Sequence, residues 1–322
     1  MASAREGVYA CYAGPGSGKT ATCVYRIASL IREGISPDDL LALSFTVTGA
    51  RNLRTRVEEI TGPWSINRTA GSMTLHSLAL KFVEQEREEM PFELAEFPLA
   101  TEPVANKLSA EAARRYEIDP RSLRTATSLF KRSRVRPNQA VAAAEKSGKA
   151  SDLKIALAYK DLDRRMREAK VLDFDSLMFE MVELMDRNSA VRERWSYKFV
   201  ICDEAQDCCQ TDWKLLYLLS SKHGNLMCVG DPGQSVFGFR GASPHMFLNM
   251  HEMFPNVQKL FLATNYRSSV ELVEFLKGIG PVPELAAKFH TPNSHGPVPV
   301  IRGFQNSAEE SAWVVSQIKG GP

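Results

Sequence analysis

The sequence predicts an α/β fold in which helices flank a parallel β-sheet, and two observations lead to this prediction. Several short segments are apolar nearly throughout, as expected of strands buried on both faces of a parallel sheet. They lie at residues 8–12, 39–45, 199–202, 226–229 and 260–262. Segments between them repeat apolar residues at helical spacing. Residues 84–170 lack strand signals and are dominated by Ala, Glu, Arg and Lys, which predicts a helical insertion.

Composition places the chain among ordinary globular proteins of about two domains. It has 322 residues, of which 44% are hydrophobic and 24% charged, and its net charge of +2 indicates no particular partner. We find no leader peptide and no apolar run of about 18 residues, so we expect a cytoplasmic protein without membrane contact. The six cysteines form no CxxC pair and are expected to be reduced thiols, four buried and two, Cys208 and Cys209, near a site.

The first strand, residues 8–12, leads into a glycine-rich turn that is followed by a helix over about residues 19–32. Residues 13–20, AGPGSGKT, fit the phosphate-loop pattern, with Ala13 where the first glycine usually stands. In such a loop backbone N–H groups surround the β-phosphate, Lys19 reaches the β- and γ-phosphates, and Thr20 holds Mg²⁺. A turn that binds nothing is the alternative, but the flanking strand and helix favour a nucleotide site. Its predicted residues are Gly14, Pro15, Gly16, Ser17, Gly18, Lys19 and Thr20.

The strand at residues 199–202 ends in two acids, Asp203 and Glu204. Asp203 would bind Mg²⁺ through water, because a carboxylate suits a hard cation, and Glu204 would orient or deprotonate the attacking water. Two acids at a strand end are weak evidence alone, but they are strong evidence when a phosphate loop accompanies them. The sequence therefore predicts that the chain binds and hydrolyses a nucleoside triphosphate.

The helical insertion contains a basic block at residues 111–136, with eight basic residues against three acids. The basic residues are Arg114, Arg115, Arg121, Arg124, Lys131, Arg132, Arg134 and Arg136. A solvated helical face and a surface that contacts nucleic acid are both consistent with this pattern.

Further segments resemble, in order along the chain, the motifs of the superfamily 1 helicases of the UvrD/Rep/PcrA type. They are residues 44–46 (SFT), 74–76 (TLH), 172–177 (LDFDSL), 203–207 (DEAQD), 229–242 (VGDPGQSVFGFRGA) and 264–268 (TNYRS). With the phosphate loop, the match runs from about residue 9 to residue 269 and is interrupted only by the helical insertion. Such an ordered set is far more specific than a phosphate loop alone.

The resemblance implies a fold and a division into domains. The fold is that of a P-loop NTPase, with a RecA-like parallel sheet flanked by helices, an inserted helical subdomain and the start of a second RecA-like domain. Residues 1–83 and 171–256 would form the first RecA-like domain (1A), residues 84–170 the inserted subdomain (1B), and residues 257–322 the truncated beginning of the second domain (2A). In this last part the sequence predicts one helix, a strand near residues 298–302 and a helix from about residue 308 to 319.

The resemblance also implies roles around the nucleotide. Gln234 would sense the γ-phosphate, and Arg240 would contact the phosphate end of the pocket or its acidic ring. Tyr266 would stack on the base, and Arg267 would stabilise charge on the transferring phosphoryl group. Together with Lys19 and Glu204 these complete the predicted catalytic set, with ATP and Mg²⁺ as cofactors. The family's adenine-reading glutamine before the loop has no counterpart, since the first glutamine is Gln85, so the choice between ATP and other triphosphates stays open.

On the nucleic-acid side, the resemblance implies that Phe45, Phe237 and Phe239 stack on bases of single-stranded DNA, a contact that tolerates any base sequence. Thr46 and His76 would contact the backbone or the bases. Ordinary core packing is the alternative for each phenylalanine, and a structural role is the alternative for the histidine.

The function that the resemblance implies is a DNA helicase or translocase motor that couples ATP hydrolysis to binding and movement of single-stranded DNA or a single-strand/duplex junction. Without most of a second motor domain we expect weak hydrolysis, and a protein partner or a missing C-terminal half would complete the machine. Two alternatives remain: a nucleotide-gated module that binds single-stranded DNA or a protein, and an ATPase subunit of a nuclease or phage-defence complex. A metabolic kinase would leave Gln206, Gln234, Tyr266 and Arg267 unexplained.

Overall fold

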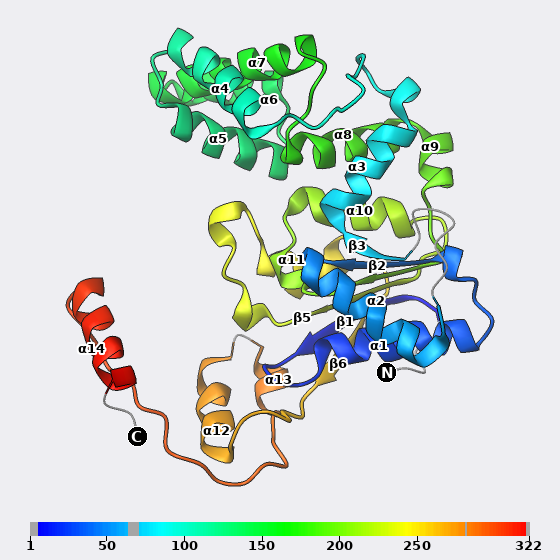
Figure 1. The fold of residues 1–322 in the computed structure, drawn as a ribbon, viewed down its shortest axis with the longest axis vertical. Coiled ribbons are helices and arrows are strands. Elements are labelled where there is room, and N and C mark those ends of the chain that lie inside the picture. The colour runs from blue at the N-terminus through cyan, green and yellow to red at the C-terminus, as the bar shows by residue number, and fades with distance from the viewer. Residues whose placement is uncertain (1–5, 64–70, 281, 320–322) are drawn as a thin grey trace.

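The predicted parallel sheet is present in the structure, a computed structural model that describes residues 6–63, 71–280 and 282–319. Six strands lie in the order β3-β2-β4-β5-β1-β6, and every neighbouring pair is parallel (Figure 1). They are β1 Val8–Ala13, β2 Leu40–Ser44, β3 Gly71–Thr74, β4 Phe199–Cys202, β5 Leu226–Gly230 and β6 Gln258–Leu262. Because all strands are parallel, their carboxyl ends meet at one edge of the sheet, where ligands bind in folds of this kind.

Helices cover both faces of the sheet, which explains why the strands are apolar nearly throughout. Residues of β1 alternate between two hydrophobic cores: Val8, Ala10 and Tyr12 pack into one, and Tyr9, Cys11 and Ala13 into the other. The second core is closed by α1 Lys19–Arg32 and α2 Val47–Thr61. The first core is closed mainly by α3 Leu75–Gln85, α8 Phe174–Arg187, α9 Ser189–Arg194, α10 Gln210–Ser220 and α11 Pro244–Leu248.

The insertion between α3 and α8 is helical, as predicted, and Figure 1 shows its four helices beyond the layer that covers the sheet. They are α4 Glu102–Arg115, α5 Pro120–Arg132, α6 Pro137–Ser147 and α7 Ala150–Glu168. These helices have small cores of their own, one around Leu123 and Leu162 and another around Tyr159. The insertion can therefore hold its shape through contacts among its own helices.

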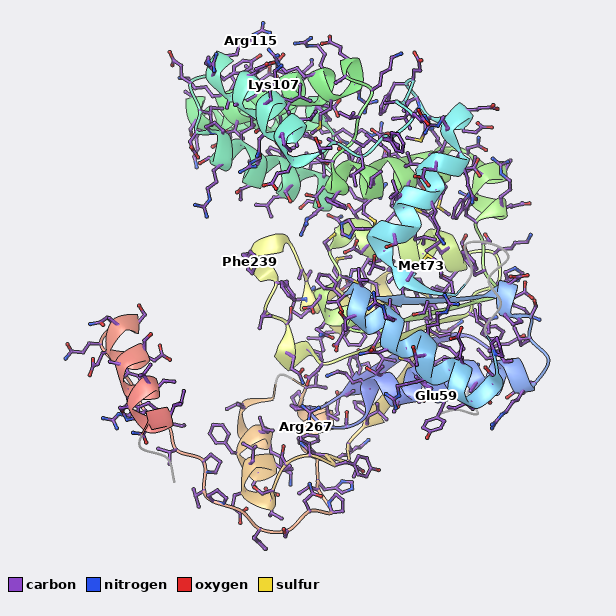
Figure 2. All side chains as sticks on the ribbon, in the orientation of Figure 1. Glu59, Met73, Lys107, Arg115, Phe239 and Arg267 are labelled. Atoms are coloured by element: carbon purple, nitrogen blue, oxygen red, sulfur yellow. The ribbon has the colours of Figure 1, made fainter. Side chains whose placement is uncertain are left out.

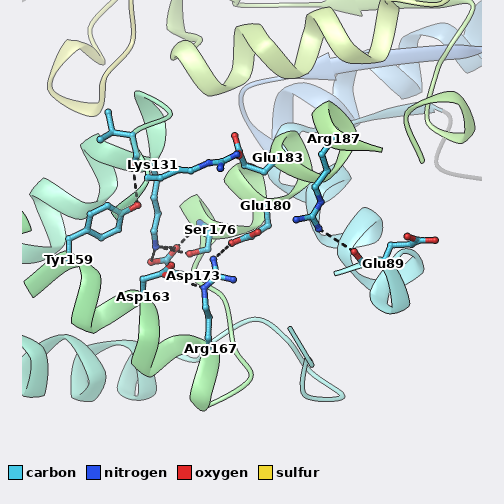
Figure 3. Close-up of polar contacts among 12 residues, drawn as sticks. Glu89, Lys131, Tyr159, Asp163, Arg167, Asp173, Ser176, Glu180, Glu183 and Arg187 are labelled. Carbon is cyan, nitrogen blue, oxygen red and sulfur yellow. Dashed lines mark hydrogen bonds and ion pairs between the residues drawn. The ribbon is translucent and has the colours of Figure 1, made fainter. Parts of the chain in front are cut away.

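The C-terminal end of the basic block in the insertion has a role that neither sequence interpretation anticipated. Lys131 is only 3% exposed, and its ammonium group donates to both carboxylate oxygens of Asp173 at 3.0 and 2.9 Å and to the Ser176 hydroxyl at 2.6 Å (Figure 3). For Lys131 both the solvated-face and the nucleic-acid interpretations are wrong. The next three basic residues also pair with acids of α8: Arg132 with Asp175, Arg134 with Glu183 and Asp186, and Arg136 with Glu183. This end of the block fastens the insertion to the helix layer on the sheet.

The chain after β5 differs from the sequence prediction in two respects. Strand β6 pairs with β1 in the central sheet, so we propose that domain 1A extends through residue 262 rather than ending at 256. The strand predicted near residues 298–302 does not form. Val298, Val300 and Ile301 are exposed there, with no strand beside them in the described residues to complete a ladder. After β6 the described helices are α12 Val270–Ile279, α13 Pro283–Ala286 and α14 Ser307–Lys319, and α14 stands apart from the rest in Figure 1.

Candidate nucleotide and nucleic-acid sites

The glycine-rich turn joins the carboxyl end of β1 to the first turn of α1. Gly16 and Gly18 have φ angles of 66° and 84°, a left-handed conformation that side-chain-bearing residues rarely adopt. The Ser17 hydroxyl donates to the Gly14 carbonyl at 2.7 Å and closes the turn. Helix α1 begins at Lys19 without an acid in its first turn, so the positive end of its dipole is left for an anion.

The segment after β6 presses against this turn from the other side. The Tyr266 N–H donates to the Gly16 carbonyl at 3.0 Å, and a Cβ at Gly16 would lie 2.8 Å from both the Arg267 Cβ and the Asn265 side-chain oxygen. Asn265 is fully buried, and its oxygen accepts from the backbone N–H groups of Arg267 and Ser268 at 2.7 and 2.8 Å. The buried asparagine thereby holds Tyr266 and Arg267 at the rim of the turn (Arg267 is labelled in Figure 2).

The two acids that follow β4 have different surroundings. Asp203 is buried: one of its carboxylate oxygens accepts from the Thr20 hydroxyl at 2.9 Å and the other from the Glu204 N–H at 3.0 Å. Burial raises the pKa of the Asp203 carboxyl to about 6, and the neighbouring Glu204 charge adds to the increase. The two predicted metal ligands are thus in direct contact. Their hydroxyl and carboxylate oxygens are the donors that Mg²⁺ prefers, and a cation between them would offset the burial of the charge.

A pocket of about 630 Å³ lies over the phosphate loop, a size that suits a nucleotide. Of the predicted nucleotide residues it is lined by Gly14, Gly16, Ser17, Gly18, Lys19, Thr20, Glu204, Gln234, Tyr266 and Arg267. Arg56, an exposed residue of α2, also lines the pocket and was not predicted from the sequence. Nothing in the residues beside Arg56 marks it as part of a nucleotide site, because it comes to the pocket only through the packing of α2. The backbone of Arg240 lies in a short 3₁₀ turn, Gly238–Arg240, and its side chain is outside the described part of the structure.

The three predicted stacking residues form a row of aromatic rings. The Phe45 and Phe237 rings stack with centroids 5.2 Å apart, and the Phe237 and Phe239 centroids are 6.2 Å apart. Phe239 is 74% exposed, so core packing is excluded for it, whereas Phe45 and Phe237 are partly buried. Figure 2 shows Phe239 on a loop that projects beyond the sheet toward the helical insertion. A row of rings that ends in the exposed Phe239 can offer a flat face to unpaired bases.

Thr46 and His76 have structural contacts of their own. The Thr46 hydroxyl caps α2 by accepting from the Gly49 N–H at 3.0 Å. The His76 ring meets Phe174 edge-on, with centroids 5.8 Å apart, and His76 lines the same small cavity as Phe45. Both residues lie at the edge of the sheet where Phe45 lies, since Thr46 follows β2 and His76 follows β3.

Comparison with known proteins agrees with this arrangement of a phosphate loop, two acids and an aromatic row. Residues 1–255 match the UvrD/REP helicase N-terminal domain. The chain belongs to the UvrD/REP helicase family. It is 30% identical over 275 residues to the ATP-dependent DNA helicase PcrA of Staphylococcus epidermidis, and 30% identical over 274 residues to that of Staphylococcus aureus. These alignments cover 83% and 82% of this chain but 37% and 36% of the relatives, so the chain spans just over a third of their length.

All six cysteines of this UvrD/REP family member lie in the described residues, are buried and form no disulfide. The prediction of reduced thiols is confirmed, but Cys208 and Cys209 are as buried as the other four. The Cys202 and Cys208 sulfurs are 3.9 Å apart beside the two acids. Within the described residues, none of the helices has the length and apolar character needed to cross a bilayer.

Proposed function

We propose that this chain is the N-terminal motor portion of an ATP-dependent DNA helicase, which hydrolyses ATP and couples hydrolysis to binding and movement of single-stranded DNA. The observation that carries the proposal is the direct contact between Thr20 of the phosphate loop and Asp203, with Glu204 in the same pocket. A phosphate loop alone is compatible with many functions, but this pocket opens at the sheet edge that also carries the aromatic row.

In the proposed reaction Lys19 and the loop N–H groups hold the β- and γ-phosphates, and Thr20 and Asp203 hold Mg²⁺. When bound, the cation neutralises charge that develops on the phosphates. Glu204 accepts a proton from the attacking water, and Arg267 stabilises the transferring phosphoryl group. Gln234 contacts the γ-phosphate, and Tyr266, which is exposed at the rim, stacks on the base.

On the DNA side, Phe45, Phe237 and Phe239 stack on successive bases, with Thr46 and His76 beside them. The proposed division is a 1A domain that contains the whole sheet, a 1B subdomain at residues 84–170, and the beginning of 2A after β6. Six cysteines without a disulfide suit a reducing cytoplasm.

The test is ATP hydrolysis with and without single-stranded DNA, with Glu204→Gln as the inactive variant. Glu59→Gln, on an exposed site of α2 (Figure 2), is the matched control. We expect weak hydrolysis that DNA stimulates, that Glu59→Gln retains and that Glu204→Gln loses. Absence of both hydrolysis and DNA binding would refute the proposal. ATP-dependent DNA binding without hydrolysis would instead favour the nucleotide-gated binding module.

A further inference from the structure

A buried glutamine, Gln206, joins the acid that follows β4 to the loop that follows β5. It lies in a 3₁₀ turn, Ala205–Asp207, and is 1% exposed. Its side-chain NH₂ donates to a Glu204 carboxylate oxygen at 2.8 Å, and its side-chain oxygen accepts from the Asp231 N–H at 2.9 Å. One amide group is therefore bonded at both ends, to the expected general base and to the backbone of a different segment.

The close approach of Gln206 to the end of β5 depends on a glycine. A Cβ at Gly230 would lie 2.5 Å from the Gln206 side-chain oxygen and 3.1 Å from its backbone nitrogen. The Gln206 carbonyl also accepts from the Ser235 hydroxyl at 3.2 Å. Backbone and side chain of Gln206 thus both contact the segment at residues 230–235.

That segment connects the nucleotide pocket to the aromatic row. The Asp231 carboxylate accepts from the Gln234 side chain at 2.6 Å and from the Gly233 N–H at 3.0 Å, and Gln234 lines the nucleotide pocket. Three residues after Gln234 comes Phe237, whose ring stacks on Phe45. A displacement of Phe237 by a base would therefore be transmitted along a short, hydrogen-bonded stretch to Asp231.

The backbone conformation of Glu204 makes the direction of its carboxylate depend on the hydrogen bonds around it. Glu204 has a φ of 56°, a left-handed conformation that is unfavourable for a residue with a side chain. Such conformations persist only where the surroundings hold them, and Gln206 supplies a hydrogen bond directly to the carboxylate. The direction of that carboxylate decides whether it can accept a proton from a water at the γ-phosphate.

We propose that Gln206 is a positioning residue that orients Glu204 and couples it to the segment carrying Gln234 and Phe237. This inference rests on the proposed function and deepens it. An amide can donate to Glu204 and accept from Asp231 at the same time. A glutamate of the same shape can only accept and would repel the Glu204 carboxylate, and a methionine can do neither.

The test compares Gln206→Glu and Gln206→Met with Gln210→Glu in the full chain. Gln210 is an exposed residue at the start of α10, so its variant adds the same charge four positions away without touching the network. Two quantities are measured: kcat and KM for ATP with saturating single-stranded DNA, and the change in DNA Kd caused by a non-hydrolysable ATP analogue.

We expect both Gln206 variants to lose about 10- to 100-fold in kcat with little change in KM, because misplacement of a catalytic group by about 1 Å has an effect of that size. The effect of the ATP analogue on DNA affinity should disappear, while Gln210→Glu retains both properties. A purely structural glutamine would leave kcat, KM and the analogue effect unchanged in any variant that folds.

Four outcomes would overturn the inference. One is a kcat equal to that of the unsubstituted chain in the Gln206 variants, and another is a lowered kcat with an intact analogue effect. A third is failure of both variants to fold, as judged by thermal unfolding, because Gln206 would then be structural. In these three cases the unsubstituted chain still shows DNA-stimulated hydrolysis, so the proposed function stands. If the unsubstituted chain neither hydrolyses ATP nor binds DNA, the proposed function and the inference fail together.

Discussion

Lys131→Met should destabilise the protein strongly, although the change is a conservative one in volume. The lysine is 3% exposed and bonds to Asp173 and Ser176 across the junction between α5 and α8. Methionine keeps most of the aliphatic chain but removes the charge, and it leaves the Asp173 carboxylate without its cation.

The magnitude follows from the burial of the two partners. Removing one member of a buried ion pair costs about 3–5 kcal/mol. The Asp173 side chain is 29% exposed, so water partly solvates the stranded carboxylate and we expect the lower end, about 3 kcal/mol. At about 2–4 °C for each kcal/mol, the melting temperature of the transition that involves this junction should fall by about 6 °C or more.

The assay is differential scanning calorimetry, with Lys107→Met as the matched control because Lys107 is exposed on α4 (Figure 2). The double variant Lys131→Met/Asp173→Asn should recover part of the loss, since asparagine removes the stranded charge and still caps α8. Equal melting temperatures for Lys131→Met and Lys107→Met would refute the reasoning. So would a double variant that is less stable than Lys131→Met alone.

Three further predictions follow from single contacts. Phe237→Ala should weaken binding of single-stranded DNA about 10-fold, because base–aromatic stacking contributes ~1–3 kcal/mol. In the same DNA titrations the control Phe97→Ala, at an exposed remote position, should leave the Kd unchanged. Gly14→Ala should lower the stability of the protein by about 1–3 kcal/mol, because the added methyl group would clash with the Phe289 ring. Calorimetry should show that Phe289→Leu partly restores the stability of Gly14→Ala. If it restores none, the contact is not the cause. Glu86→Gln should destabilise the protein by about 1–2 kcal/mol at pH 7 and by less at pH 3. Burial opposes ionisation of Glu86, but hydrogen bonds from Arg194 and Trp195 lower the pKa of its carboxyl. The ionised form therefore stabilises the fold at neutral pH, and this stabilisation is lost as the pH falls through the lowered pKa. A pH-independent difference in urea unfolding would contradict this assignment.

The sequence alone determined the residues of the proposed nucleotide site and the class of fold. Each of these features depends on a few consecutive residues: the phosphate loop, the acids after β4 and the parallel strands. Backbone conformation and burial on two faces constrain neighbouring positions directly. The stacking residues Phe45, Phe237 and Phe239 were expected from the order of motifs, and the structure added the contacts between their rings and the exposure of Phe239.

Only the tertiary structure decided which distant residues become partners. The basic block could not be interpreted from its charge, because the acid that meets Lys131 lies 42 residues further along the chain, at the N-cap of α8. Gln206 belongs to one of the sequence motifs, but its partner across the sheet edge does not follow from that motif: two hydrogen bonds link the ends of β4 and β5 through it. Residues 298–302 have the apolar pattern of a strand, but no strand lies beside them in the part of the chain that the structure describes. A strand is stabilised by hydrogen bonds to another segment and not by its own composition.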